Sequence, residues 1–266
     1  MSDFWIRQCE IIAGGKRFNM NDLDIEFTVP FDNDEEPDIS KVKIYNLSES
    51  SIHEIKKEQN VIINAGYKGD VSTIFKGTLQ KTLTSWYGVD KATSLTIGDG
   101  SQQWLTKHVS EAYCEEITAQ EILADLTGKF GLELGKLNLV NNLSYPKGRV
   151  IDSSLKDAIK QIVKECDTSF TISKGRIFIM PHDDGIATGF LLNSDTGLIG
   201  SPEVFEKEEN GITKKGFKIK MLLNHRITIN SIIQVESKTA NGTYRVLRGR
   251  HKNTGIDFLT EVEAVE

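Results

Sequence analysis

Residues 40–79, SKVKIYNLSESSIHEIKKEQNVIINAGYKGDVSTIFKGTL, constrain the fold more than any other stretch of the chain. Side chains in 42–47 alternate between apolar and polar, which is the two-residue period of a β-strand. Ser48 is a good N-cap for a helix over 49–57. Further strands are expected at 61–67, 73–83 and 92–97. Strands at intervals of about ten residues with a single helix predict a small, partly closed barrel over residues 1–100.

The pattern changes to helices after residue 100. Thr118 and Glu121 have the spacing of a capping box at the start of one helix. A second helix, capped by Ser153 or Ser154, places one set of apolar residues on a single face: Leu155, Ala158, Ile159, Ile162, Val163 and Cys166. A hairpin over 169–180 follows it. These elements predict an α+β insertion over residues 101–188.

Strand patterns resume from residue 190 and continue to the end of the chain. Asn241-Gly242 stands between two strand patterns and predicts the turn of a hairpin. The predicted fold class is therefore mainly β with an α+β insertion, in three domains over 1–100, 101–188 and 189–266. The pattern leaves open whether the flanking β segments form two separate domains or one packed pair.

The chain has 266 residues and a net charge of −6. We do not expect it to bind nucleic acid tightly, because that affinity comes from cations that neutralise phosphates. No apolar run is long enough to span a bilayer, and the first residues lack the pattern of a secretory signal. We therefore expect synthesis in the cytoplasm and no membrane insertion of this chain. Cys9, Cys114 and Cys166 are irregularly spaced, which favours neither a disulfide framework nor a zinc site.

Candidates for chemistry are few. Cys166 continues the apolar face of the second helix, so we interpret it as a core residue, and neither Cys9 nor Cys114 has a histidine in a patterned arrangement. His182-Asp183-Asp184 is the best metal candidate, but adjacent residues cannot all reach one ion without ligands from elsewhere. We interpret these three residues as a turn after a strand.

Two charged clusters remain. Eight acidic residues and no basic one lie between Asp22 and Asp38, and the segment fails as a calcium loop because Lys43 stands where the closing glutamate belongs. We interpret it as a solvated loop. A basic cluster near the end of the chain comprises Arg245, Arg248, Arg250, His251 and Lys252. Strand alternation divides this cluster between two faces and only Tyr244 adds an aromatic ring, which favours a protein–protein salt contact or a solvated strand edge over nucleic-acid binding.

Signature motifs of catalysis are missing from the sequence: there is no GxSxG, no Walker loop, no HExxH and no GxGxxG. The sequence therefore predicts no catalytic, cofactor-binding or metal-binding residues, and no cofactor.

The segment from Pro37 to Leu79, followed by Asp99-Gly100, resembles the N-terminal domain of phage tail baseplate hub proteins. In that family, found in contractile and related phage tails and in phage-derived injection particles, an IYNLS-like strand end precedes a short helix, an AGY-like strand and an IFKG-like strand. Three later stretches are similar to the closing β domain of the family: TGLIGSPE (196–203), KIKMLLNHRITINSIIQVES (218–237) and GTYRVLRGRH (242–251).

The resemblance implies a non-enzymatic structural protein of the virion. Its two tube-like β-barrel domains are expected to be near-copies of each other that flank the helix and hairpin domain. Three copies would form a trimeric, pseudo-sixfold ring that joins the tail tube to the central spike. The implied partners are further copies of itself, the tail tube or distal tail protein, the spike or tail-tip protein, the tape-measure protein, and DNA that passes through the channel without specific binding. No appended lysozyme, peptidase or spike region is expected.

Two alternatives stay open. A tail component that hydrolyses cell-wall glycan would need two carboxyl groups within about 5–9 Å of each other, with Glu121 and Asp183 as candidates. A module that binds cell-wall glycan would be housed in residues 101–185.

Overall fold

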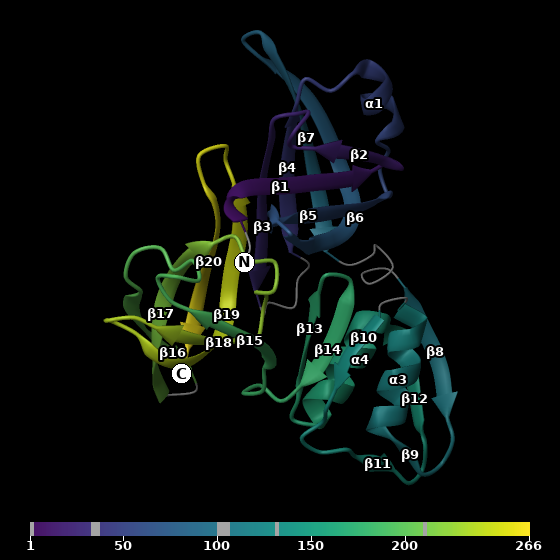
Figure 1. Cartoon of the computed structure of the whole chain (residues 1–266). Coiled ribbons are helices and arrows are strands. Elements are labelled where there is room, and N and C mark those ends of the chain that lie inside the picture. Colours follow the sequence, from purple (N-terminus) through teal and green to yellow (C-terminus); the bar gives the residue numbers. More distant parts are fainter. Residues whose placement is uncertain (1–2, 33–37, 100–106, 131–132, 210–211) are drawn as a thin grey trace. The chain divides into compact units, whose positions relative to one another are not determined.

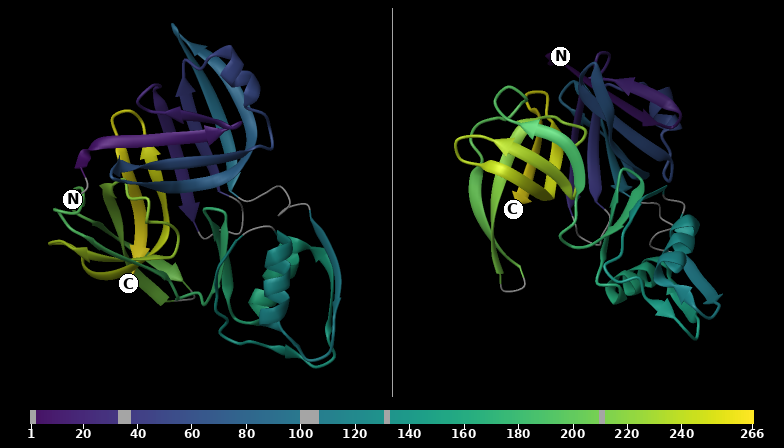
Figure 2. Two further views of the ribbon diagram at one scale, coloured as in Figure 1. Left: turned by 45° about the vertical axis from the view of Figure 1, so that its right-hand side comes forward. Right: turned by 60° about the horizontal axis from the view of Figure 1, so that its bottom comes forward.

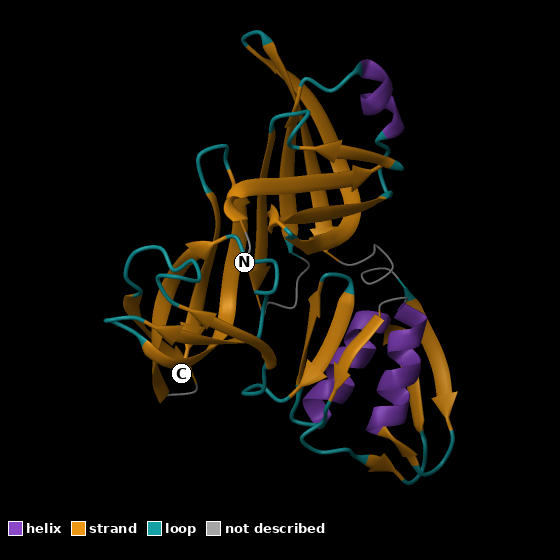
Figure 3. Cartoon of the chain, viewed as in Figure 1, coloured by secondary structure: helices purple, strands orange, loops and turns teal. Residues whose placement is uncertain are grey.

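The computed structural model describes residues 3–32, 38–99, 107–130, 133–209 and 212–266 (Figure 1). The chain divides into two compact units. Met1–Asp99 and Gly185–Glu266 together form one, called here the β unit, and Gly100–Asp184 form the other, called the insertion unit. Strands dominate the described residues (Figure 3), which confirms the mainly β fold class. The three predicted domains, 1–100, 101–188 and 189–266, stay a prediction.

The β unit has two lobes, which we name by sequence. The N-lobe, residues 3–99, contains β1 (Asp3–Ala13), β2 (Lys16–Asn19), β3 (Ile25–Asp32), β4 (Ile39–Tyr45), α1 (Glu49–Glu54), β5 (Asn60–Lys68), β6 (Asp70–Tyr87) and β7 (Asp90–Asp99). The C-lobe, residues 185–266, contains β15 (Ile186–Leu192), β16 (Glu203–Glu209), β17 (Ile212–Leu222), β18 (Ser231–Glu236), β19 (Asn241–Asn253) and β20 (Phe258–Val265).

The two lobes repeat one strand order. In the N-lobe, neighbouring strands follow β3-β4-β7-β6-β5-β1, and in the C-lobe they follow β16-β17-β20-β19-β18-β15. Each strand of the first series therefore has a counterpart in the second, from β3 and β16 at one end to β1 and β15 at the other. The last pair differs, because β1 runs antiparallel to β5 whereas β15 runs parallel to β18. The strand order confirms the expectation that the flanking segments fold alike.

Irregularities of the sheet also recur in both lobes. A β-bulge leaves Gln80 unpaired between β6 and β7, and another leaves Leu247 unpaired at the corresponding place between β19 and β20. Just before the bulge, the backbone N–H of Glu58 donates to Leu79, and that of Asn230 donates to Val246 in the same way. Both donors have a positive φ, 69° for Glu58 and 58° for Asn230. Shared bulges and turns fix which residue of one lobe corresponds to which of the other.

One cross-strand hydrogen bond follows this correspondence. The hydroxyls of Thr84 and Thr93 lie 3.1 Å apart between β6 and β7. At the matching place between β19 and β20, His251 Nδ1 lies 2.8 Å from the Thr260 hydroxyl. The repeat therefore extends to a polar cross-strand pair, in which Thr93 corresponds to an identical residue, Thr260, and Thr84 to a different one, His251.

Each lobe has its own hydrophobic core, but the cores exchange residues. Phe258 and Leu223 of the C-lobe are buried in the N-lobe core, and Phe31 of the N-lobe is buried in the C-lobe core. The buried residues of β3 alternate and so share one face, on which Phe27 and Val29 reach the N-lobe core and Phe31, further along the strand, reaches the C-lobe core. The two lobes are thus packed as one body.

The described strands form no closed barrel. The large sheet of the β unit runs in a single order from β16 at one end to β2 at the other, and β15 and β18 extend it beside β19. The mainly antiparallel sheet is therefore open among the described residues, and the predicted tube-like barrels are not observed in one copy of the chain.

The insertion unit is built on two helices. Its elements are β8 (His108–Tyr113), β9 (Ile117–Thr118), α3 (Ala119–Phe130), β10 (Glu133–Leu137), β11 (Ser144–Tyr145), β12 (Arg149–Ser154), α4 (Leu155–Glu165), β13 (Ser169–Ser173) and β14 (Arg176–Met180). The apolar face predicted for the second helix is fully buried in α4, and Ser154 is its N-cap. β13 and β14 form the predicted hairpin.

Two local predictions were wrong. Helix α1 ends at Glu54 instead of residue 57, because Ile55 adopts an extended backbone and buries its side chain in the N-lobe core. The turn between β18 and β19 lies at 237–240, and Asn241-Gly242 already belongs to β19. The Ser237 hydroxyl accepts from the backbone N–H of Ala240 at 3.0 Å, so a serine turn replaces the predicted Asn-Gly turn.

Candidate assembly surfaces

Strand β3 joins the lobes, because it pairs on both of its sides. Residues Ile25–Thr28 pair with β4 of the N-lobe. Residues Phe27–Asp32 pair antiparallel with Arg248–Asn253 of β19 in the C-lobe. One sheet therefore runs through both lobes (Figure 2). The Asn253 side chain, buried at this point, donates to the Ile25 carbonyl at 2.5 Å and satisfies a backbone group at the junction.

Aromatic contacts reinforce the junction. The ring of Phe258 meets Tyr67 edge-to-face, with centroids 5.4 Å apart, and meets Phe27 with centroids 6.3 Å apart. The Tyr67 hydroxyl donates to the Phe258 carbonyl at 3.1 Å. The Arg7 guanidinium lies over the Phe258 ring and donates to the Gly255 carbonyl. Edge-to-face pairs of this kind add stability beyond burial of their area.

A charged clamp ties the β5–β6 turn of the N-lobe to the β17–β18 loop of the C-lobe. The Asp70 carboxylate accepts two hydrogen bonds from the Arg226 guanidinium, at 2.6 and 2.7 Å, and its Oδ1 lies 2.9 Å from His225 Nε2. Bonds from Arg226, outweighing partial burial, and from His225 lower the pKa of Asp70 to about 2.

We predict that Asp70→Ala lowers the free energy of unfolding by about 1 kcal/mol at pH 7, since the clamp is partly exposed to solvent. The pKa of Asp70 is lowered on folding, so its contribution is complete above its ordinary pKa of 3.8 and is lost as the pH falls towards 2. Urea unfolding of both proteins between pH 7 and 2 measures the difference. Asp22→Ala, at an exposed position, is the control. A difference that stays constant down to pH 2 would contradict the assignment.

A ladder of alternating charges lines a groove of about 800 Å³ on the outer face of the C-lobe sheet. One row crosses five strands in register: Glu203, Lys218, Glu263, Arg248 and Asp32. Arg248 Nε lies 2.6 Å from a Glu263 oxygen, and in the next row Arg250 lies 2.6 Å from Glu261. Because cations and anions alternate, the groove offers phosphates few unneutralised cations.

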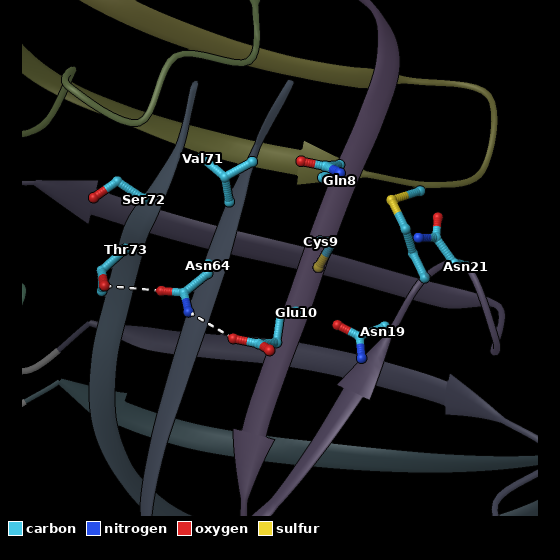
Figure 4. A pocket seen from close by; sticks show the side chains of 10 residues that line it. Gln8, Cys9, Glu10, Asn19, Asn21, Asn64, Val71, Ser72 and Thr73 are labelled. Atoms are coloured by element: carbon cyan, nitrogen blue, oxygen red, sulfur yellow. Dashed lines mark hydrogen bonds between the residues drawn. The ribbon is translucent and has the colours of Figure 1, made fainter. Parts of the chain in front are cut away.

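A second, smaller pocket of about 410 Å³ lies on the N-lobe (Figure 4). Asn19, Glu10, Asn64 and Thr73 form a row across β2, β1, β5 and β6. Asn64 donates to Glu10 at 3.1 Å and accepts from the Thr73 hydroxyl at 2.8 Å. The row holds a single carboxylate, whereas glycoside hydrolysis normally uses a pair. The row therefore links neighbouring strands by hydrogen bonds and lacks the carboxylate pair that a glycoside hydrolase would need.

Only part of the basic cluster predicted near the chain end is exposed to solvent. Arg248 and Arg250 are exposed and paired with glutamates of β20, and Arg245 donates to the Asn230 side chain at 3.2 Å. His251, in contrast, is completely buried, so its inclusion in the cluster was wrong. The bulge at Leu247 shifts the alternation and turns His251 inward. The salt contacts lie within the chain.

The cysteines lie where a nucleophile is not expected. Cys9 lines the N-lobe pocket but is buried, and burial together with the charge of Glu10 raises the pKa of its thiol to about 12. Cys166 is fully buried at the C-cap of α4, and burial raises the pKa of its thiol. Cys114 is exposed. A reactive cysteine needs a lowered pKa, which neither buried thiol has.

Of the carboxylates considered for metal binding or hydrolysis, Glu121 and Asp184 make structural contacts, and Asp183 lies exposed in the turn after β14. Glu121 accepts from the backbone N–H of Thr118 at 2.9 Å and from its hydroxyl at 2.6 Å, which is the predicted capping box. Asp184 lies 2.6 Å from Lys136 Nζ. Within the described ranges, no group of three His, Cys, Asp or Glu residues could hold a metal ion.

Part of the acidic segment, residues 33–37, falls outside the described residues. At its flanks, the Asp38 carboxylate accepts from the backbone N–H of Asp32 at 3.4 Å. The interpretation as a solvated loop stays a prediction.

None of the helices in the described part of the chain is long and apolar enough to cross a bilayer.

Sequence reasoning missed the Asp70 clamp and the pairing of β3 with β19. Asp70 and Arg226 are 156 positions apart, and no local pattern connects them. The available signal was weak: apolar residues alternate along the whole of β3, which indicates one buried face over its full length but not which strands pair with it.

No family model and no curated protein matches the sequence. Solved structures do match. A tail protein from Neisseria meningitidis MC58 has a TM-score of 0.69 at 9% identity, with 98% of this chain and 97% of that chain covered. The 43 kDa tail protein of prophage MuSo2 from Shewanella oneidensis has a TM-score of 0.69 at 9% identity, covering 98% of both chains. An E. coli component of the type VI secretion system has a TM-score of 0.59 at 8% identity, covering 91% of this chain and 73% of that chain.

The similarity extends over nearly the whole chain, including both lobes of the β unit and the insertion unit. At this level of identity it establishes the fold. The chain therefore has the fold of phage tail proteins, which confirms the resemblance seen in its sequence.

Proposed function

We propose that the chain is a structural, non-enzymatic hub of the baseplate of a phage tail or phage-like injection particle. Three copies form a pseudo-sixfold ring that joins the tail tube to the central spike. One observation carries the proposal: each chain contains the same strand order twice, in lobes that share one sheet. Three such chains present six similar lobes, which reconciles a threefold spike with a sixfold tube.

The two similar tail proteins support the proposed position in a phage tail, because the match covers 98% of this chain. The proposed partners are the tail tube or distal tail protein on one face of the ring and the spike or tail-tip protein on the other, with the tape-measure protein inside. DNA passes without specific binding, in keeping with the net charge of −6. The proposed location is the virion, and the closed tube-like wall forms when copies join.

Self-assembly of the full-length chain tests the proposal. Sedimentation over a range of concentrations is expected to show a three-subunit species, and electron microscopy of mixtures with tail tubes from the same particle is expected to show rings at tube ends. A chain that stays monomeric at every concentration and does not join tubes would refute the hub.

The glycan alternative makes a different prediction. Incubation of the chain with purified cell wall is expected to give neither retention nor release of soluble fragments, since Glu121 serves in a helix capping box and Asp183, the other candidate carboxylate, lies in an exposed turn. Fragments released by the wild type and lost in Glu121→Gln would favour the hydrolase instead.

A further inference from the structure

Part of strand β6 has a free edge. β5 pairs with β6 only as far as Thr78, which lies opposite Asn60 at the start of β5. Beyond the bulge, Lys81–Trp86 pair with β7 alone among the described strands. A row of unpaired backbone groups on such an edge is a template for another strand.

The internal repeat shows which strand belongs there. The bulges align Lys81–Trp86 of β6 with Arg248–Asn253 of β19. In the C-lobe this segment is not free: β3 pairs along it. The counterpart of β3 in the repeat is β16, which is paired with β17 alone among the strands described. Within the described residues of one chain, β3 is thus paired with β19, whereas their counterparts β16 and β6 are not paired with each other.

We propose that β16 of one copy pairs antiparallel with Lys81–Trp86 of β6 in the next copy, repeating the β3–β19 junction between chains. The inference rests on the proposed ring and names the edges that close it. Three internal junctions then alternate with three between copies.

The repeat also gives the register. Thr28 of β3 pairs with Lys41, as Glu203 of β16 pairs with Lys218, so Thr28 and Glu203 correspond. Because Thr28 lies opposite Lys252, Glu203 is placed opposite the counterpart of Lys252, which is Ser85. Two further pairs follow along the strands, Val204 opposite Thr84 and Phe205 opposite Leu83.

This register covers side chains whose exposure is otherwise unexplained. Leu83 is 53% exposed, Trp86 70% and Val204 58%. Leu83 meets Phe205 on one face of the joined sheet. On the other face Val204 and Trp86 become diagonal neighbours, a spacing that an aromatic side chain spans. Apolar groups lie on both faces of β6, as expected of a strand that becomes internal to a sheet and not of one that docks by a single face.

Disulfide trapping tests the register. In a Cys114→Ser background, where the remaining native cysteines are buried, Ser85→Cys and Glu203→Cys are combined in one chain. With oxidised glutathione we expect covalent dimers and trimers on a denaturing gel. Either substitution alone is expected to give none, and so is Ser85→Cys combined with Val150→Cys, whose position in the insertion unit is 75% exposed.

A second variant does not depend on trapping. Trp86→Asp and Val204→Asp are each expected to raise the dissociation constant of the trimer at least about tenfold, since both bury a charge in the joined sheet. Val150→Asp is the matched control and is expected to leave it unchanged. The melting temperature of the monomer reports whether each variant is folded.

The outcomes separate the two proposals. Trimers by sedimentation that give no covalent ladder and tolerate both aspartates would overturn the edge pairing while the hub stands. A chain that neither trimerises nor joins tubes would overturn the hub, and the edge pairing with it. Loss of tube joining with an intact trimer would assign these edges to the tube protein and also overturn the pairing between copies.

Discussion

Phe258→Ala is expected to lower the free energy of unfolding of the β unit by about 3–5 kcal/mol, because the change opens a cavity at a fully packed site. Phe258 is 2% exposed and belongs by sequence to the C-lobe, yet its ring lies in the N-lobe core between Tyr67 and Phe27. The loss therefore falls on the junction as well as on the core.

Urea unfolding followed by aromatic fluorescence measures this effect. Ile256→Ala, two residues away and 87% exposed, is the matched control and is expected to change the free energy by less than about 0.5 kcal/mol. Tyr67→Phe removes only the hydrogen bond to the Phe258 carbonyl and is expected to cost about 1 kcal/mol. A loss below about 1 kcal/mol for Phe258→Ala would contradict the packing described here.

Ile159→Ala is expected to destabilise the insertion unit by about 2–5 kcal/mol, since Ile159 is fully buried on the apolar face of α4. The core of this unit contains residues of the insertion only. Hydrogen exchange is therefore expected to rise in peptides from 107–184 and to stay unchanged in peptides from β17 and β20. Lys164→Ala, exposed on the same helix, is the control. Faster exchange throughout the chain would show that the two units unfold together.

Local structure was largely predictable from the sequence. The face of α4, the Ser154 cap, the Thr118–Glu121 capping box and the hairpin of β13 and β14 all depend on residues close in sequence. Periodicity and capping act over a few residues, so a single sequence contains the information.

Pairing between distant strands was not predictable. Nothing in residues 25–32 indicates that β19 is the partner, because the choice depends on which edges are free once both sheets have formed. The turn forms at Ser237 instead of Asn241-Gly242, because β18 ends at Glu236 and the Ser237 hydroxyl accepts a hydrogen bond that closes the connection before Asn241. The internal repeat was equally hidden, since Gln80 and Leu247 occupy the same bulge with unlike side chains.

For the candidate surfaces too, the sequence predicted local composition but not the contacts between distant residues. The basic cluster was found by its composition, but the bulge that turns His251 inward and the glutamates that neutralise Arg248 and Arg250 became visible only in the sheet. Asp70 has no distinguishing pattern in the sequence, although in the structure its carboxylate contacts both Arg226 and His225 at the junction.

The sharing of β3 between the lobes has a kinetic consequence. In the proposed ring, half of the six lobe junctions form while each chain folds, at a concentration-independent rate, because the partners are tethered. Only two encounters between molecules remain, because the third junction between copies closes within the assembled trimer. Translational and rotational freedom is therefore lost twice, whereas a ring of six single lobes would lose it five times. Ring closure should therefore follow a third-order dependence on protein at most, and proceed at dilutions where six independent subunits would stay apart.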